Sequence, residues 1–99
     1  MQGVYEKKRW TLDAITWTPI TAPYDCNTVT LRNLDSVNNI KLRTQSGDAN
    51  TEDILTPDLQ EHLGGPSQPG GSFRFSKAQT VVFAQTVAGT GPLLATYLV

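Results

Sequence analysis

The chain has 99 residues, of which 8 are Lys or Arg and 9 are Asp or Glu, so its net charge is −1. A chain this close to neutral has no overall attraction for phosphate backbones or anionic lipids, which argues against nucleic acid and membrane surfaces as partners. A single cysteine, Cys26, and a single histidine, His62, exclude an internal disulfide and a cysteine/histidine zinc set. No apolar stretch approaches the roughly 20 residues that cross a bilayer, and the first ten residues lack the apolar core of a signal peptide. We expect one domain, residues 1–99, without a cofactor and made in the cytoplasm.

The N-terminal segment RWTLDAITWT alternates through Trp10 and Leu12 and then shifts phase to Ile15 and Trp17. A β-bulge produces such a shift, so the segment is either one bulged strand or two short strands. Residues 1–9 are a candidate N-terminal arm ahead of a core that begins near Trp10.

The next segment, NTVTLRNLDSVNNIKLRT, contains two alternating runs. Val29 and Leu31 fall on one face of the first run, and Ile40 and Leu42 fall on one face of the second. Asparagine and aspartate residues supply turn chemistry between them, so we predict an antiparallel hairpin with one solvated face. The solvated face carries three cations, Arg32, Lys41 and Arg43. Such a stripe is either a binding surface or the ordinary charged exterior of a sheet.

The middle of the chain begins with a polar loop, QSGDANTED. Its alternating oxygen side chains could hold Ca²⁺ or simply be solvated, and they are Asp48, Asn50, Glu52 and Asp53. In ILTPDLQEHLGG, Pro57 stands at a first helical position, and Leu59 and Leu63 lie four residues apart. This spacing favours one or two helical turns within 56–63. The alternative is a strand at Asp53–Leu55 that runs into an irregular loop.

The C-terminal part begins with GGPSQPGG, a loop by composition that lacks the Lys-Ser or Lys-Thr pair of a phosphate-binding P-loop. SFRFS places Phe73 and Phe75 on one face. KAQTVVFAQT predicts a strand with Val81 and Phe83 inward, and PLLATYLV predicts a last strand after the turn VAGTG. The whole pattern predicts an all-β fold, an antiparallel β-sandwich or jelly-roll-like barrel of about seven or eight short strands with at most one short helix.

The residues offer little for catalysis. A nucleophile pair would require Cys26 and His62 to meet beside a third, orienting group, and nothing in the sequence requires that. A sandwich of 99 residues also has little room for a cleft around paired carboxylates. We therefore expect no enzyme, no catalytic residues and no metal site. A carbohydrate-binding module is the alternative, with Trp10, Trp17 and Tyr24 as an exposed aromatic platform.

The last strand is apolar on both faces, because Leu94 and Leu98 alternate with Leu93 and Tyr97. A strand of this kind is either central between two layers or covered on one side by another subunit. The basic run near the N-terminus lies beside aromatic residues and could rest on an acidic neighbour. The candidate interface residues are Tyr5, Lys7, Lys8, Arg9, Trp10, Tyr97, Leu98 and Val99.

From about Thr28 onward the chain resembles the small β-sandwich proteins of tailed bacteriophage virions. The resemblance lies in TVTLRNLDSVNNIKLRT, a proline-containing middle, and FRFSKAQTVVFAQTVAGTGPLLATYLV. These are an asparagine-punctuated pair of runs, a strand opened by Lys-Ala-Gln-Thr, and a Gly-Thr-Gly turn before the last strand. The family includes capsid decoration or cement proteins and related head and tail accessory proteins. It has no fixed functional motif, so no binding residue carries over to this chain.

The resemblance implies a non-enzymatic structural protein of the virion. Such a protein binds the lattice of the major capsid protein or other virion proteins and stabilises the head against internal pressure. It also implies a homo-oligomer, most often a trimer, located in the virion after synthesis in the host cytoplasm.

Overall fold

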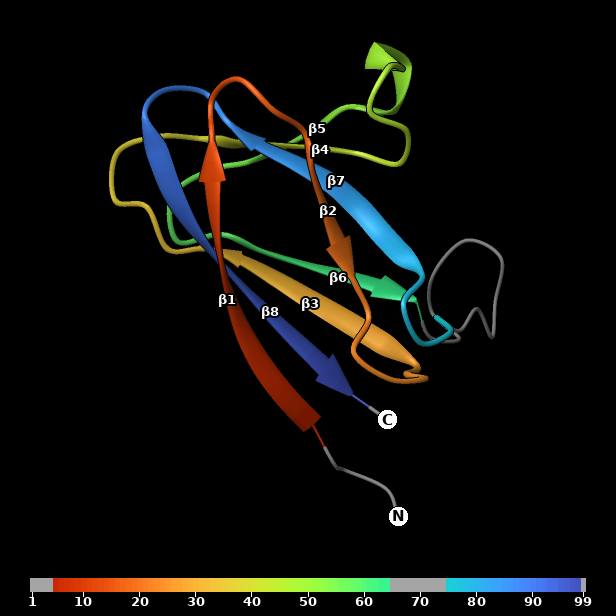
Figure 1. Ribbon diagram of the computed structural model, residues 1–99. Helices are drawn as coiled ribbons and strands as arrows, with labels where there is room; N and C mark the ends of the chain where they lie inside the picture. Colours follow the sequence, from red (N-terminus) through yellow and green to blue (C-terminus); the bar gives the residue numbers. More distant parts are fainter. Residues whose placement is uncertain (1–4, 65–74, 99) are drawn as a thin grey trace.

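Two antiparallel sheets of four strands face each other in the computed structural model, which describes residues 5–64 and 75–98 (Figure 1). One sheet has the strand order β1-β8-β3-β6 and the other has the order β2-β7-β4-β5. The elements are β1 (Tyr5–Asp13), β2 (Thr18–Thr21), β3 (Thr28–Asn33), β4 (Ile40–Arg43), the 3-10 turn η1 (Ala49–Thr51), β5 (Asp53–Leu55), β6 (Gln60–Gly64), β7 (Thr80–Thr86) and β8 (Thr90–Leu98). The predicted antiparallel β-sandwich is confirmed.

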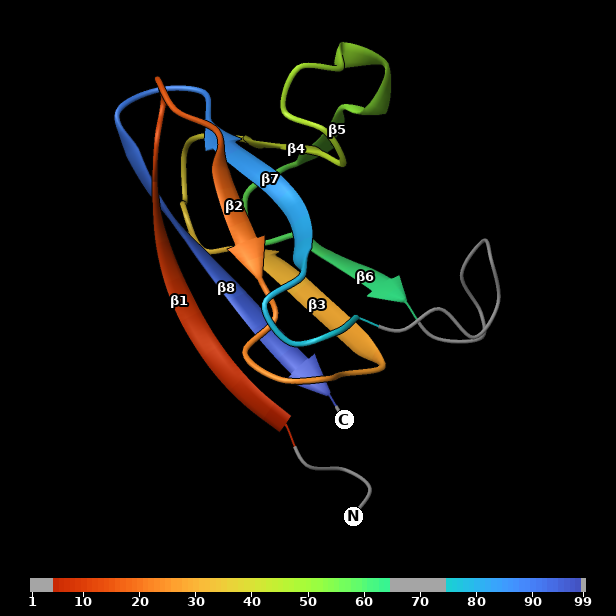
Figure 2. The same ribbon diagram turned by 45° about the vertical axis from the view of Figure 1, so that its right-hand side comes forward.

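The first and last strands are neighbours along their whole length, as both views show (Figures 1 and 2). Their register runs from Tyr5 opposite Leu98 to Asp13 opposite Thr90. The prediction of an N-terminal arm over residues 1–9 is therefore wrong from Tyr5 onward, because these residues pair with β8. Residues 1–4 lie outside the described part of the chain. A strand pairing between the two ends of a chain leaves no local signal in the sequence.

The N-terminal segment forms two strands rather than one bulged strand. Asp13 ends β1, and its carboxylate Oδ1 accepts hydrogen bonds from the backbone N–H groups of Ile15 (2.8 Å) and Thr16 (2.6 Å). This turn carries the chain from one sheet to the other, since β1 pairs with β8 and β2 pairs with β7. The second of the two alternatives drawn from the phase shift is thus correct.

The predicted hairpin of β3 and β4 is wrong, although both strands and their buried faces are where the alternation places them. Val29, Leu31, Ile40 and Leu42 are buried as expected. However, β3 pairs with β6 and β8, whereas β4 pairs with β5 and β7 in the opposite sheet. Alternation indicates which side chains point inward, but it does not indicate which strand lies alongside. Residues 34–39 are therefore a crossing between the sheets.

The predicted helical turns within 56–63 are also wrong, and the alternative strand at Asp53–Leu55 is correct. β5 is followed by a turn at Pro57 and Asp58 and then by β6. Asp58 has a positive φ of 64°, which no α-helix contains, and its carboxylate forms an ion pair with Arg32 of β3. Pairing of β6 with β3 outweighs the weak helical spacing of two leucines.

The prediction for β7 is correct for Val81, which is buried, and wrong for Phe83. Val82 and Ala84 face the other sheet, as shown by their pairing with the buried residues Ile20 and Leu42. Phe83 lies on the outer face. The segment TVVFAQT is apolar at adjacent positions, so its own periodicity does not select a face. Phe75 is buried and forms an isolated bridge with Cys26, whereas Phe73 and most of GGPSQPGG lie outside the described residues.

Candidate interaction surface

The outer face of the β1-β8-β3-β6 sheet follows directly from the alternation along β8. Leu93, Ala95 and Tyr97 are fully buried between the sheets. Leu94, Thr96 and Leu98 therefore point away from the core, and Leu98 remains 38% exposed. The sequence shows that both faces of β8 are apolar. One of these faces belongs to the core, and the other lies on the surface of the protein.

The register of the four strands brings distant residues together on this face. Lys7 of β1 lies opposite Thr96 of β8, which lies opposite Thr30 of β3. Together with the adjoining positions they form an open groove of about 370 Å³. The described residues that line it are Lys7, Thr28, Thr30, Arg32, Gln60, Leu94, Thr96 and Leu98. We call this surface the β8 face.

The chemistry of the β8 face suits contact rather than catalysis. Its described lining side chains are hydroxyl, amide, aliphatic and cationic groups, with no carboxylate, imidazole or thiol among them. Arg32 points its guanidinium to Asp58, with the Nε–H donating to the carboxylate Oδ1 at 3.1 Å. One of the two cations is thus held in place by an acidic neighbour at the rim. The face combines the exposed Leu98 and the partly buried Leu94 with polar groups, a mixture common in protein–protein contacts.

Comparison with known proteins gave no match. No family model matches the chain, and no curated protein or solved structure is significantly similar to it. Inferences about function therefore rest on the geometry of this chain and on the resemblance noted in its sequence.

The predicted interface residues do not gather at one place. Lys7 and Leu98 line the β8 face, and Arg9 is exposed. Lys8 and Trp10 stay together, with the Lys8 Nζ 4.0 Å from the centroid of the Trp10 ring. The side chain of Tyr5 and the whole of Val99 lie outside the described residues.

Tyr97 is not a surface residue, so its assignment to the interface is wrong. It is fully buried, and its hydroxyl oxygen accepts a hydrogen bond from the indole Nε1–H of Trp10 at 3.2 Å. The hydroxyl of Tyr24 donates to the Tyr97 carbonyl at 3.2 Å. Burial raises the pKa of the Tyr97 phenol, and the hydrogen bond from Trp10 partly opposes this change. Tyr97 therefore anchors two half-buried aromatic residues to the core.

Most residues of the β8 face were not identified from the sequence. Thr28, Thr30 and Thr96 are polar residues on strands, and only the strand register makes them neighbours. The alternation groups Arg32 with Lys41 and Arg43 in one cationic stripe, but those two residues lie on β4 of the other sheet. The sequence feature that indicates this face is the second apolar side of β8, which includes Leu98.

The three aromatic residues proposed for carbohydrate binding do not form one platform. Trp10 and Tyr24 pack at Tyr97, whereas Trp17 lies next to β4 of the other sheet. The Arg43 guanidinium carbon is 4.4 Å from the centroid of the Trp17 ring. A face occupied by a guanidinium is not open for stacking against a sugar.

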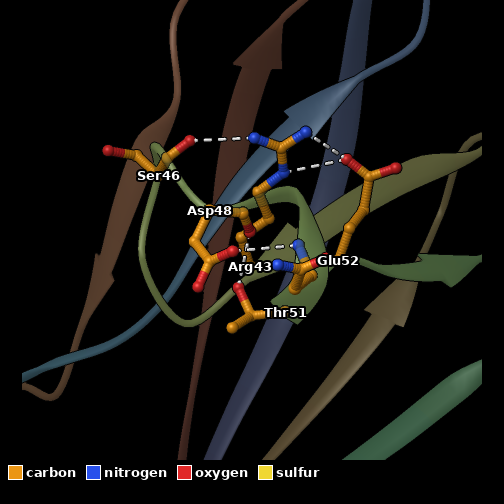
Figure 3. A network of polar contacts seen from close by, with 6 residues as sticks. Arg43, Ser46, Asp48, Thr51 and Glu52 are labelled. Atoms are coloured by element: carbon orange, nitrogen blue, oxygen red, sulfur yellow. Dashed lines mark hydrogen bonds and ion pairs between the residues drawn. The ribbon is translucent and has the colours of Figure 1, made fainter.

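Two of the four side chains considered for Ca²⁺, Asp48 and Glu52, accept hydrogen bonds from within the protein (Figure 3). Arg43 donates from Nε and Nη2 to Oε1 of Glu52 at 2.8 and 2.6 Å, and from Nη1 to the Ser46 carbonyl at 3.0 Å. The Asp48 carboxylate caps η1 by accepting from the backbone N–H of Asn50 at 3.0 Å. Within residues 5–64 and 75–98, no three His, Cys, Asp or Glu side chains are grouped to hold a metal ion.

The remaining candidates from the sequence concern thiol chemistry and membranes. Cys26 is fully buried, and the side chain of His62 lies outside the described residues, so the expectation that they form no catalytic pair stays a prediction. Within the described ranges, no helix reaches the length and apolarity that crossing a bilayer requires.

Proposed function

We propose that this protein is a non-enzymatic structural protein of a bacteriophage virion, a capsid decoration protein that attaches through its β8 face. The observation that carries the proposal is that face, which joins exposed leucine, hydroxyl and cationic groups on one sheet. The sequence resemblance to small virion β-sandwiches supports the same role. The partner is the lattice of the major capsid protein, and the location is the virion.

The size of the β8 face fits a contact that works by repetition. Four strands spaced about 4.8 Å apart, with five to nine residues each at about 3.3 Å per residue, span roughly 400–600 Å². A stable pairwise interface usually buries about 800 Å² on each partner. One such contact is therefore weak, and attachment at many equivalent lattice positions or as a homo-oligomer raises the avidity. A trimer supplies three copies of the face at once.

The proposal is tested by co-sedimentation of the purified chain with genome-free heads of the phage that carries this sequence. Leu98→Glu places a charge on the β8 face, and we expect it to weaken attachment at least about tenfold. Ile54→Glu on β5 of the other sheet is the matched control, because Ile54 is 43% exposed and Leu98 is 38% exposed. We expect this control to bind like the unaltered chain.

Two results would contradict the proposal. In the first, the unaltered chain fails to sediment with the heads and stays monomeric in analytical ultracentrifugation at high concentration. In the second, both variants bind equally well, which would place attachment elsewhere on the chain. Binding of a glycan that is lost on Trp17→Ala would favour the carbohydrate-binding alternative instead.

A further inference from the structure

Each sheet ends in an edge strand on the same side of the sandwich, β6 in one sheet and β5 in the other (Figure 1). Among residues 5–64 and 75–98, each of these two strands pairs with a neighbour on one side only. Asp53 of β5 pairs with Leu42, and Glu61 of β6 pairs with Leu31. Both partners are buried core residues, so Asp53 and Glu61 occupy positions in phase with the core. Two carboxyl groups thus occupy strand positions at which the neighbouring strands carry apolar core residues.

The Asp53 and Glu61 side chains join the two sheets across this edge. They share a hydrogen bond and line a cleft of about 100 Å³. The described residues around the cleft are Leu42, Arg43, Thr44, Thr51, Asp53, Glu61, Leu63 and Val82. Two carboxyl groups can share a hydrogen bond only if one of them carries a proton, because an ionised carboxylate only accepts.

The surroundings favour the protonated form of Glu61. The pKa of Glu61 is raised from 4.5 to about 7, first by desolvation on burial, then by the hydrogen bond to Asp53 and by the negative charge of Asp53. The cation at the cleft is Arg43 of β4, and its guanidinium is bound to Glu52. β7 and β6 present the apolar groups of Val82 and Leu63.

We propose that Asp53 and Glu61 form a proton-dependent latch, which joins the two sheets at this edge while Glu61 is protonated and parts when Glu61 loses its proton to water. With both groups ionised, two negative charges face each other across a small, partly apolar cleft. Their repulsion moves β5 and β6 apart and lets water reach Leu63 and Leu42. The released proton goes to solvent, and no other group needs to change its charge.

The direction of the pH effect follows from the two pKa values. In the unfolded chain Glu61 loses its proton near pH 4.5, whereas in the folded protein it keeps the proton to about pH 7. Between these values the folded state binds more protons than the unfolded state. Stability therefore decreases as pH rises from about 5 to about 8 and is constant above that range. Full expression of the shift would change the unfolding constant by about 30-fold between pH 5.5 and pH 8.0. We expect about tenfold, because Glu61 is only partly buried and solvent reduces the effect.

The test is urea unfolding of the full chain at pH 5.5 and pH 8.0, with Glu61→Gln as the comparison. We expect the unfolding constant of the unaltered chain to rise about tenfold and that of Glu61→Gln to change less than about twofold. The glutamine keeps a hydrogen-bond donor toward Asp53 but cannot ionise. Taking the difference between the two proteins isolates the contribution of Glu61 from that of the other groups.

Amide hydrogen exchange shows where the change occurs. At pH 8.0 the protection of β5 and β6, relative to Glu61→Gln, should fall at least about fivefold, while β1 and β8 stay equal in the two proteins. Asp53→Asn is a second variant. Its amide can donate to the ionised Glu61 carboxylate and carries no charge, so the pH dependence should be smaller than in the unaltered chain, with only the desolvation of Glu61 left to raise its pKa. Parallel pH profiles for the unaltered chain and either folded variant would overturn the proposal. So would a protection loss spread evenly over all strands.

Discussion

Replacing Asn33 by alanine should destabilise the protein more than almost any other single polar substitution. Asn33 ends β3 at the point where the chain leaves one sheet for the other, and it is fully buried. Its side-chain Nδ2 donates to the carbonyls of Asn38 and Leu55, both at 2.9 Å, and its Oδ1 accepts from the N–H of Asp35 at 2.8 Å. One amide group thus joins β3, the crossing segment and the end of β5.

The expected cost follows from these three hydrogen bonds. Each contributes about 1 kcal/mol net, and a buried acceptor left without a donor adds about 1–3 kcal/mol. We therefore expect Asn33→Ala to lower the free energy of unfolding by about 4–6 kcal/mol, out of about 5–15 kcal/mol for a domain of this kind. Asn38→Ala is the control. Its Nδ2 makes only long contacts of 3.3 and 3.4 Å, and its removal should cost less than about 1 kcal/mol.

The assay is urea unfolding at pH 5.5, followed by tryptophan fluorescence and by far-ultraviolet circular dichroism, with free energies extrapolated to water. If Asn33→Ala stays within about 1 kcal/mol of the unaltered chain, the bridging role assigned to this amide is incorrect. Equal losses in Asn33→Ala and Asn38→Ala would show that the crossing segment is destabilised as a whole, which also refutes the argument.

Two further predictions concern acid and the N-terminus. Backbone N–H groups lower the pKa of Asp13 (Thr16 first, then Ile15) and of Asp35 (Val37 first, then Asn38). The stability they contribute is present above the unfolded value of 3.8 and is lost as pH falls through the lower folded values. Urea midpoints between pH 5 and pH 2.5 should therefore decrease toward acid, and less so in Asp13→Asn and Asp35→Asn. Separately, deletion of residues 1–9 removes five of the nine residue pairs between β1 and β8. It should lower the thermal midpoint by more than about 10 °C, whereas deletion of residues 1–4 keeps all of β1 and serves as the control.

The sequence by itself determined the class of fold and the inward faces of several strands. Val29 with Leu31, and Ile40 with Leu42, are buried as their alternation requires. Alternation is a local property, because successive side chains of any strand point to opposite sides. The sequence also shows that both faces of β8 carry apolar residues, although the core covers only one of them. The other face belongs to the candidate interaction surface.

The tertiary structure alone decided which strands are neighbours. Tyr5 pairs with Leu98, at the other end of the chain. β3 and β4 lie in different sheets although they are consecutive. Residues 60–64 form a strand because they pair with the distant β3. The same pairing assembles the β8 face and brings Asp53 to Glu61. The physical reason is that a residue pattern fixes the face that a strand buries. The partner strand is chosen by the packing of the whole chain, and no local stretch contains that information.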